Sequence, residues 1–143
     1  MARENVERLR WLYSEWARGN LWALSEIADP DIEWAWADEM ASLFGGPRTY
    51  RGLDEIAAAT LEWLAAWDRY WMTADDFIEA GDDVVVVLME LHARTADSET
   101  VVEQKVAAVW GMRDGKAVRV RYYMDRADAL AAVQPGARGG RST

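Results

Sequence analysis

The stretch that decides the fold is residues 84–112, VVVVLMELHARTADSETVVEQKVAAVWGM. Two runs rich in β-branched residues flank the turn signal Asp97-Ser98, a pattern typical of two antiparallel strands. If the turn pairs Ala96 with Glu99, one face of the pair carries five cross-strand partners. These are Val85–Trp110, Val87–Ala108, Met89–Val106, Leu91–Gln104 and Ala93–Val102. Gln104 is the one polar member of this set, so the register predicts a face that packs against a core.

The opposite face of the same two strands supports this register. It pairs Glu90 with Lys105 and His92 with Glu103, which are complementary in charge. A three-residue loop at 114–116 then leads into a further strand and brings Tyr122 beside Ala108. The sequence therefore predicts a three-stranded meander with an apolar face and a charged face.

Outward from this meander, helical periodicity and turn residues divide the remaining chain. Helices are expected at 4–18, 21–28, 53–70 and 126–133, and a loop at about 38–51. Strands are expected at 31–36, 71–79, 84–95, 100–112 and 117–124. Helices followed by a long antiparallel sheet indicate an α+β fold. We expect one domain at 1–134 and a disordered tail at 135–143.

Composition excludes several classes of protein. The formal net charge of −9 disfavours nucleic-acid binding, which needs basic side chains to neutralise phosphates. No run of about 18 apolar residues is present, so we expect no membrane partner. The chain has no cysteine, which excludes disulfides and thiolate metal sites. A cytoplasmic location is the resulting expectation.

Nine tryptophans in 143 residues predict a hollow lined by aromatic rings. Indoles bury a large apolar area and carry an N–H group that needs a partner. For any single tryptophan an ordinary core position is the alternative, but a core of this size does not need nine. The predicted ligand-binding residues are Trp16, Trp36, Leu64, Trp67, Met89, Gln104, Trp110 and Tyr122. Gln104 would orient a ligand oxygen, or else bond to a loop or to Tyr122.

Several local motifs carry a resemblance to a known family. They include the strand 29–34 (DPDIEW), the segment 48–56 (RTYRGLDEI), the turns 80–83 (AGDD) and 113–116 (RDGK), and 123–130 (YMDRADAL). Over residues 5–133 the chain resembles the SnoaL-like branch of the NTF2-like (nuclear transport factor 2-like) superfamily. The resemblance implies a cone, in which a curved antiparallel or mixed sheet wraps round helices and encloses an internal pocket. Members include polyketide cyclases, ketosteroid isomerases, epoxide hydrolases, dehydratases and binding modules, and the fold alone does not choose among them.

The resemblance assigns roles to individual residues. Ketosteroid isomerases place an oxyanion-donating tyrosine on the first helix, where this chain has Tyr13. Their catalytic base corresponds to Trp36 and their second acid to a position near Val106, neither of which can serve. The Arg-x-Asp strand of limonene-type epoxide hydrolases and the two histidines of scytalone-type dehydratases are missing. SnoaL-type cyclases use an aspartate near the end of the last strand, and Asp125 is the nearest match.

Three residues are therefore the predicted catalytic groups, each with an alternative role. Tyr13 donates to a ligand oxygen or is a core tyrosine. Asp125 is a general acid/base or the N-cap of the last helix. His92 faces away from the hollow in the predicted register, where it suits a surface or dimer contact. A register shift by one residue would turn it into the pocket and make it the leading base.

No metal-binding or phosphate-binding spacing is visible, so we expect no metal and no cofactor. We expect a homodimer through the charged outer face of the sheet. Two functions are compatible with this hollow lined by aromatic rings. The first is a cofactor-independent cyclase, isomerase or hydrolase that acts on a hydrophobic, oxygen-bearing small molecule. The second is a non-catalytic module that binds such a molecule.

Overall fold

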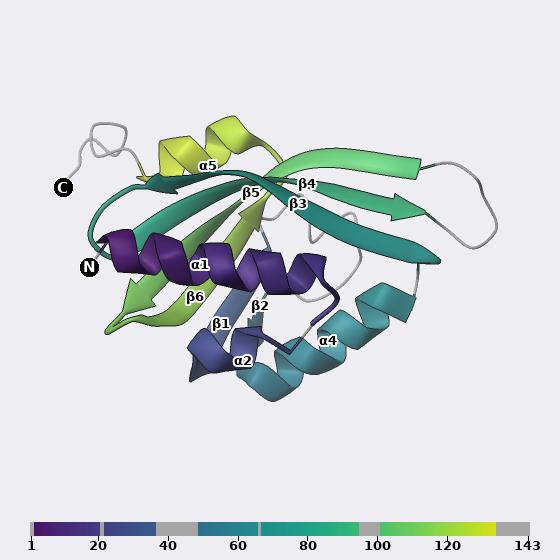
Figure 1. Cartoon of the computed structure of the whole chain (residues 1–143), viewed down its shortest axis with the longest axis horizontal. Helices are drawn as coiled ribbons and strands as arrows, with labels where there is room; N and C mark the ends of the chain where they lie inside the picture. Colours follow the sequence, from purple (N-terminus) through teal and green to yellow (C-terminus); the bar gives the residue numbers. More distant parts are fainter. Residues whose placement is uncertain (1, 21, 37–48, 66, 95–100, 134–143) are drawn as a thin grey trace.

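The structure is a computed structural model that describes residues 2–20, 22–36, 49–65, 67–94 and 101–133. It combines one six-stranded sheet with flanking helices (Figure 1), which confirms the predicted α+β class. The elements are α1 (Ala2–Ala17), α2 (Leu24–Ile27), β1 (Ala28–Trp36), β2 (Thr49–Arg51), α4 (Leu53–Ala65), β3 (Arg69–Glu79), β4 (Val84–Arg94), β5 (Val101–Arg113), β6 (Lys116–Tyr123) and α5 (Arg126–Val133). The predicted tail at 135–143 lies outside the described residues.

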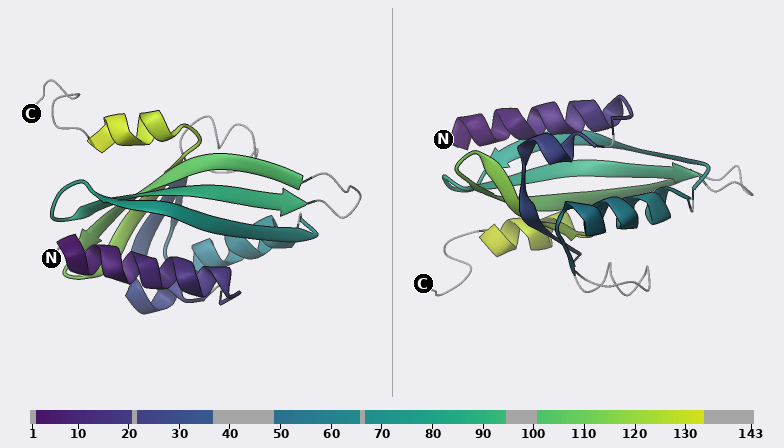
Figure 2. Two further views of the ribbon diagram at one scale, coloured as in Figure 1. Left: turned by 45° about the horizontal axis from the view of Figure 1, so that its top comes forward. Right: turned by 90° about the horizontal axis from the view of Figure 1, so that it is seen from below.

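The sheet is mixed and has the strand order β2-β1-β6-β5-β4-β3. Its β1–β6 pair is parallel, and the other neighbouring pairs are antiparallel. Figure 2 shows α1 on one face of the sheet and α5 on the other. We call the face under α1 the inner face and the face under α5 the outer face. None of the described helices is long and apolar enough to cross a membrane.

The register predicted for the meander is confirmed. Val85 pairs with Trp110 and His92 with Glu103 in the β4–β5 ladder, and Tyr122 pairs with Ala108 in the β5–β6 ladder. Because side chains alternate along a strand, these pairs fix which residues share a face. Trp110 and Tyr122 therefore lie on the inner face, and His92 lies on the outer face.

Helix α1 forms because its apolar residues recur at helical spacing and bury one stripe against the inner face. Leu9 and Leu12 are fully buried there, and Tyr13 is 5% exposed. Gly19 ends the helix in a left-handed conformation, with φ of +92°. Its amide donates to the carbonyl of Trp16 at 3.0 Å, which is the usual use of glycine after a helix.

A bulge in β3 changes the face on which later residues lie. The β3–β4 register shifts between Ala74, which pairs with Met89, and Asp76, which pairs with Leu88. The extra residue, Asp75, makes an ion pair with Arg126 at 2.5 Å. Because the bulge adds one residue, Phe77 lies on the inner face although simple alternation from Trp71 would place it outside.

The helix predicted at 53–70 is shorter in the structure, where α4 ends at Ala65. The amide of Asp68 donates to the carbonyl of Arg94 at 2.7 Å, and Arg69 then pairs with Arg94 in the β3–β4 ladder. The backbone of residues 68–70 therefore pairs with β4 instead of continuing the helix. The predicted loop at 38–51 contains the short strand β2 at its end, and its residues 38–48 lie outside the described ranges.

Two hydrophobic cores lie on opposite sides of the sheet. The larger one fills the inner face between the sheet, α1, α2 and α4, and has Trp110, Leu9, Leu12 and Ile32 fully buried. The smaller one lies under α5 and centres on Val86, Ala107 and Ala129. The large core rigidly positions the polar groups that it contains.

Candidate functional site

Six rings pack together in the larger core, and we call this set the inner aromatic cluster. Its members are Tyr13, Trp16, Trp34, Phe77, Trp110 and Tyr122. Tyr13 makes edge contacts with Trp16 at 5.1 Å and with Phe77 at 5.8 Å between ring centroids. Trp34 stacks on Tyr122 at 5.1 Å with an interplanar angle of 18°. These geometries are the favourable ones for aromatic pairs, so the cluster is a rigid support for its hydroxyl groups.

Two phenol hydroxyls are enclosed by this cluster. The indole Nε1 of Trp110 donates to Tyr13 Oη at 3.1 Å, and this hydrogen bond is buried. Tyr122 is as buried as Tyr13, each being 5% exposed. Tyr122 Oη has no hydrogen-bond partner among the residues that the structure describes. A buried hydroxyl without a partner is costly, by about 1–3 kcal/mol, and is therefore rare in native proteins.

Burial sets the protonation state of both phenols. Desolvation raises the pKa of Tyr13 well above its ordinary value, and the hydrogen bond from Trp110 offsets only part of this effect. Desolvation also raises the pKa of Tyr122, and the neighbouring phenol of Tyr13 raises it further. The two hydroxyls are also close enough to interact directly, which lowers the pKa of Tyr13 and raises that of Tyr122, although this contact is not a hydrogen bond of good geometry. Both groups are therefore neutral, and each carries an O–H that can donate a hydrogen bond.

The inner face is closed at one end and open at the other. At the closed end, under α1, residues such as Val85, Val87 and Trp110 are fully buried. At the open end, toward the carboxyl end of β4, Ala93 is buried, but the other residues are only half-buried or exposed. They are Trp36, Leu64, Trp67, Tyr70, Met72 and Leu91, which are half-buried, and Gln104, which is exposed. Figure 1 shows that α1 ends before this part of β3 and β4, whereas α4 packs against β1 and β2.

The two hydroxyls lie near the boundary between these ends. Tyr70 belongs to the half-buried open end, yet it is close enough to raise the pKa of both Tyr13 and Tyr122. The open end therefore lies next to two neutral, buried phenol hydroxyls. Such donors suit a carbonyl, hydroxyl or enolate oxygen.

The predicted binding residues fall into two groups. Trp16, Met89, Trp110 and Tyr122 lie in or against the large core, and Met89 is fully buried. Trp36, Leu64, Trp67 and Gln104 belong to the open end. The side chain of Gln104 is exposed although its strand face is otherwise apolar, and its Nε2 donates to the carbonyl of Lys105 at 3.5 Å. It is exposed because neither α1 nor α5 covers this end of β5.

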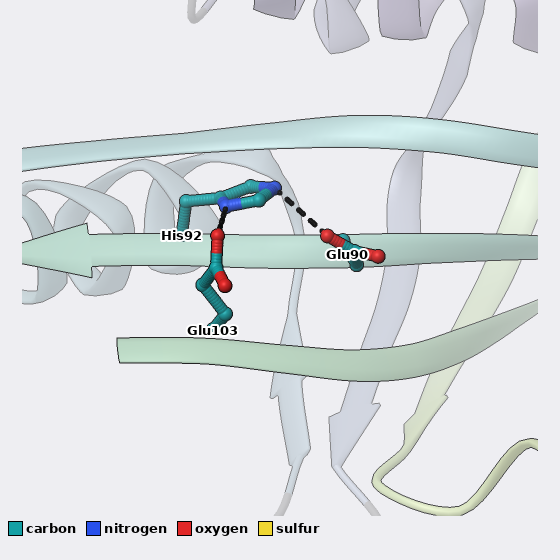
Figure 3. A group of neighbouring side chains, drawn as sticks. All are labelled: Glu90, His92 and Glu103. Atoms are coloured by element: carbon teal, nitrogen blue, oxygen red, sulfur yellow. Dashed lines mark hydrogen bonds and ion pairs between the residues drawn. The ribbon is translucent and has the colours of Figure 1, made fainter. Parts of the chain in front are cut away.

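The predicted catalytic groups are not brought together. Tyr13 lies in the inner aromatic cluster. Asp125 is exposed, and its Oδ1 accepts from the amide of Ala127 at 2.7 Å, which is an N-cap of α5. His92 lies on the outer face between two glutamates (Figure 3). A proton-transfer role for Asp125 or His92 stays a prediction.

Sequence reasoning did not select three residues that the structure adds to this site. Trp34 shares a strand face with Trp36, and that alternation could have selected it. Phe77 was hidden by the bulge in β3. Tyr70 was hidden because it was assigned to a helix, whereas it lies in β3 opposite Ala93.

The internal pocket expected from the sequence stays a prediction. The described residues outline a hollow of about 450 Å³ in a different place, between α1 and α2. Its lining is formed by Glu4, Glu7, Arg8, Trp11, Glu26 and Ile27. This hollow is open to solvent and contains none of the predicted site residues.

Comparison with known proteins agrees with this architecture. No curated protein matches the chain. An NTF2-like protein of unknown function from Burkholderia pseudomallei superposes with a TM-score of 0.75 at 24% identity, over 92% of this chain and 98% of that one. TerC, crystallised with polyporic acid, gives a TM-score of 0.75 at 22% identity, over 91% and 98% of the two chains. A candidate SnoaL-like polyketide cyclase from Jannaschia sp. CCS1 gives 0.71 at 18% identity, over 92% of each chain.

These likenesses establish the NTF2-like fold and leave the activity open. The model of the SnoaL-like domain matches residues 9–120, which run from α1 into β6 and include every member of the inner aromatic cluster except Tyr122. The predicted resemblance is thereby confirmed, and the chain belongs to the SnoaL-like domain family.

Proposed function

We propose that this chain binds a hydrophobic, oxygen-bearing small molecule at the open end of the inner face and acts on it without a cofactor. Tyr13 and Tyr122 donate hydrogen bonds to one oxygen of that molecule. The observation that carries the proposal is the buried hydroxyl of Tyr122, which has no partner among the described residues and lies beside the neutral phenol of Tyr13. A ligand oxygen would satisfy it.

The chemistry that two neutral phenols support is stabilisation of negative charge on oxygen. Trp110 donates to Tyr13 Oη, so the hydrogen of Tyr13 is left for another acceptor. Donors aimed at a developing enolate or alkoxide lower the barrier, and each is worth roughly 100- to 1000-fold in kcat. This suits the general acid–base reactions of cyclases, isomerases and hydrolases.

Two structural neighbours support this class of ligand and reaction. TerC was crystallised with polyporic acid, so an NTF2-like relative has been studied with an organic acid. The Jannaschia neighbour is a candidate polyketide cyclase. At these identities the likeness concerns the fold, and the specific substrate of this chain is a matter for experiment.

A second candidate function is a binding module without chemistry. It is favoured by the position of the acidic groups, because none of the carboxylates in the described part of the chain is buried. The single histidine lies on the outer face. Asp38 and Glu39 lie outside the described residues. If no proton acceptor reaches the ligand, the two phenols would orient it but not transform it.

The test is ligand binding followed by turnover. Apolar ketones, epoxides and polyphenols are screened by quenching of tryptophan fluorescence, and each ligand that binds is incubated with the protein and examined by mass spectrometry. Tyr122→Phe should weaken binding of an oxygen-bearing ligand about 2- to 10-fold, the value of one hydrogen bond. Tyr123→Phe is the matched control, because Tyr123 is the next residue and packs against the smaller core.

If the protein converts a bound ligand and Tyr13→Phe loses this conversion, the result supports the enzymatic function. Binding without conversion supports the module. The absence of any ligand, or equal affinity in Tyr122→Phe and Tyr123→Phe, would contradict both.

The homodimer and the cytoplasmic location remain part of the proposal. The outer face beyond α5 carries paired charges such as Glu90 opposite Lys105 and His92 opposite Glu103, which suit a polar symmetric contact. Light scattering after size exclusion tests it. A dimer that dissociates on charge reversal of Lys105 agrees with the outer face as the contact, and a monomer at all concentrations refutes it.

A further inference from the structure

A second polar cluster lies on the outer face of the sheet, on β4 and β5. Glu90 and His92 lie two residues apart on β4, and Glu103 lies across from His92 on β5 (Figure 3). Nε2 of His92 is 3.3 Å from Glu90 Oε1, and Nδ1 is 3.2 Å from Glu103 Oε2. His92 is 8% exposed, although it lies on the solvent side of the sheet.

The arrangement places a carboxylate oxygen beside each nitrogen of one buried ring. A neutral imidazole has one N–H donor and one lone pair, so it can satisfy only one of the two carboxylates. If the ring proton is on Nδ1, it is donated to Glu103. The lone pair of Nε2 then lies beside the carboxylate of Glu90, so two hydrogen-bond acceptors face each other. The hydroxyl of Thr73, at 3.4 Å from Nε2, is at the limit of a hydrogen bond. Either a second proton, on Nε2, or a metal cation between Nε2 and Glu90 would remove the conflict.

The distances suit a small divalent ion. Two ligand atoms that each lie about 2.0 Å from a tetrahedral zinc ion are about 3.3 Å apart. The separation of His92 Nε2 from Glu90 Oε1 is 3.3 Å. One ligand atom from each of Glu90, His92 and Glu103 can be chosen so that all lie within 4.8 Å of one another.

We propose that His92 Nε2 and the carboxylate of Glu90 bind a divalent transition-metal ion of the Zn²⁺ type. Glu103 holds Nδ1–H and thereby fixes the tautomer and orientation of the ring, the usual role of an outer carboxylate. Solvent and the Thr73 hydroxyl lie within reach of the remaining positions. The sequence alone predicted no metal, because these residues come from two strands and form no local spacing motif.

The neighbouring aromatic residue makes the ring rigid. Trp71 stacks on His92 with centroids 4.9 Å apart and planes 7° apart. The Arg69 guanidinium lies 4.4 Å from the Trp71 ring centroid. This stack restricts rotation of the imidazole, and it places an indole close to the proposed ion as a spectroscopic reporter.

Nearby cations oppose metal binding and provide a means to adjust it. Lys105 is exposed and pairs with Glu90 across the β4–β5 ladder. Arg94 is already paired with Asp68 at 3.0 Å. Replacing Lys105 with methionine should therefore tighten binding of a divalent ion.

The experiment is calorimetric titration of the untagged full chain with ZnCl₂, repeated with CoCl₂ while the visible absorption and the tryptophan fluorescence are recorded. We expect one saturable site per chain, cobalt bands in the visible region and quenching of tryptophan emission. His92→Gln and Glu90→Gln should abolish saturable binding, and Glu103→Gln should weaken it 10- to 100-fold. Lys105→Met should strengthen it.

Asp54→Asn is the matched control, since Asp54 is an exposed carboxylate on α4. It should bind zinc as the wild type does. Circular dichroism verifies that each variant is folded, and Glu90→Gln carries the test if His92→Gln does not fold, because the Glu90 side chain is 29% exposed. No saturable binding by the wild type, or equal binding by wild type, His92→Gln and Glu90→Gln, would overturn the proposal. The outcome is independent of the ligand proposed for the inner face.

Discussion

The two faces of the sheet formed by β4, β5 and β6 carry different kinds of polar group in different surroundings. On the inner face, Tyr13 and Tyr122 bring neutral hydroxyls into an apolar core. On the outer face, His92 lies between Glu90 and Glu103, at the edge of solvent. A strand alternates its side chains, so one stretch of sequence builds both environments. The inner face therefore holds buried phenols in an apolar surrounding, whereas the outer face holds a histidine flanked by two carboxylates.

The largest expected difference between the faces is in stability. Trp110→Ala removes a fully buried ring from the inner face and should lower the free energy of unfolding by about 3–5 kcal/mol. Trp71→Ala removes a half-buried ring from the outer face and should have a clearly smaller effect. Urea denaturation followed by circular dichroism measures both. Similar losses in the two variants would mean that the inner face is not the main core.

A smaller difference separates the two phenols of the inner face. Tyr13→Phe leaves the buried indole N–H of Trp110 without its acceptor and should destabilise the fold by about 1–3 kcal/mol. Tyr122→Phe removes a hydroxyl without a protein partner, so the unliganded protein should be as stable as the wild type or more so. Thermal unfolding of both variants tests this. A large loss in Tyr122→Phe would show that its hydroxyl is satisfied within the protein.

The inner phenols should also make stability depend on alkaline pH. Their pKa values are raised in the folded state above the ordinary value of 10.0. Below pH 10 both the folded and the unfolded states carry neutral phenols, so this contribution to stability is fully present. Above pH 10 only the unfolded state ionises, and stability falls by about 1.4 kcal/mol per pH unit for each such tyrosine.

Tyrosinate absorbance during alkaline titration measures this effect. The folded protein should ionise fewer than its five tyrosines until it unfolds. Ionisation of all five in the folded protein near pH 10 would contradict the burial of the inner phenols.

The smallest effect concerns Asp125 and distinguishes its two proposed roles. Asp125→Ala removes the cap of α5 and should cost about 1 kcal/mol, whereas Asp125→Asn keeps a capping side chain and should cost less. If Asp125 acts only as a cap, Asp125→Asn retains any turnover. Loss of turnover in a fully stable Asp125→Asn protein would assign it the proton-transfer role instead.

The register of the meander was predictable because both faces constrained it at once. A slip of one residue would have placed Glu90 and His92 against Trp110 and its neighbours. The sequence therefore also predicted that His92 lies opposite Glu103. It did not predict that Trp71 stacks on His92, because that contact depends on where β3 begins.

The remaining differences have local physical causes. Asp75 is an extra residue in β3, and no pattern of alternation anticipates a bulge that reverses the face of Phe77. Gln104 looked buried because its strand face is apolar, but burial depends on which helix covers that face. The partnerless hydroxyl of Tyr122 is a property of three-dimensional packing and has no counterpart in sequence spacing.

The central claim is that Tyr13 and Tyr122 together hold a ligand oxygen, and a crystal structure of the chain with the tightest ligand from the screen tests it most directly. The account predicts a ligand oxygen about 2.7–2.8 Å from Oη of both tyrosines, with the apolar part of the ligand against Trp36, Tyr70 and Leu91. A ligand bound in the hollow between α1 and α2, or bound with no oxygen near either phenol, would contradict it.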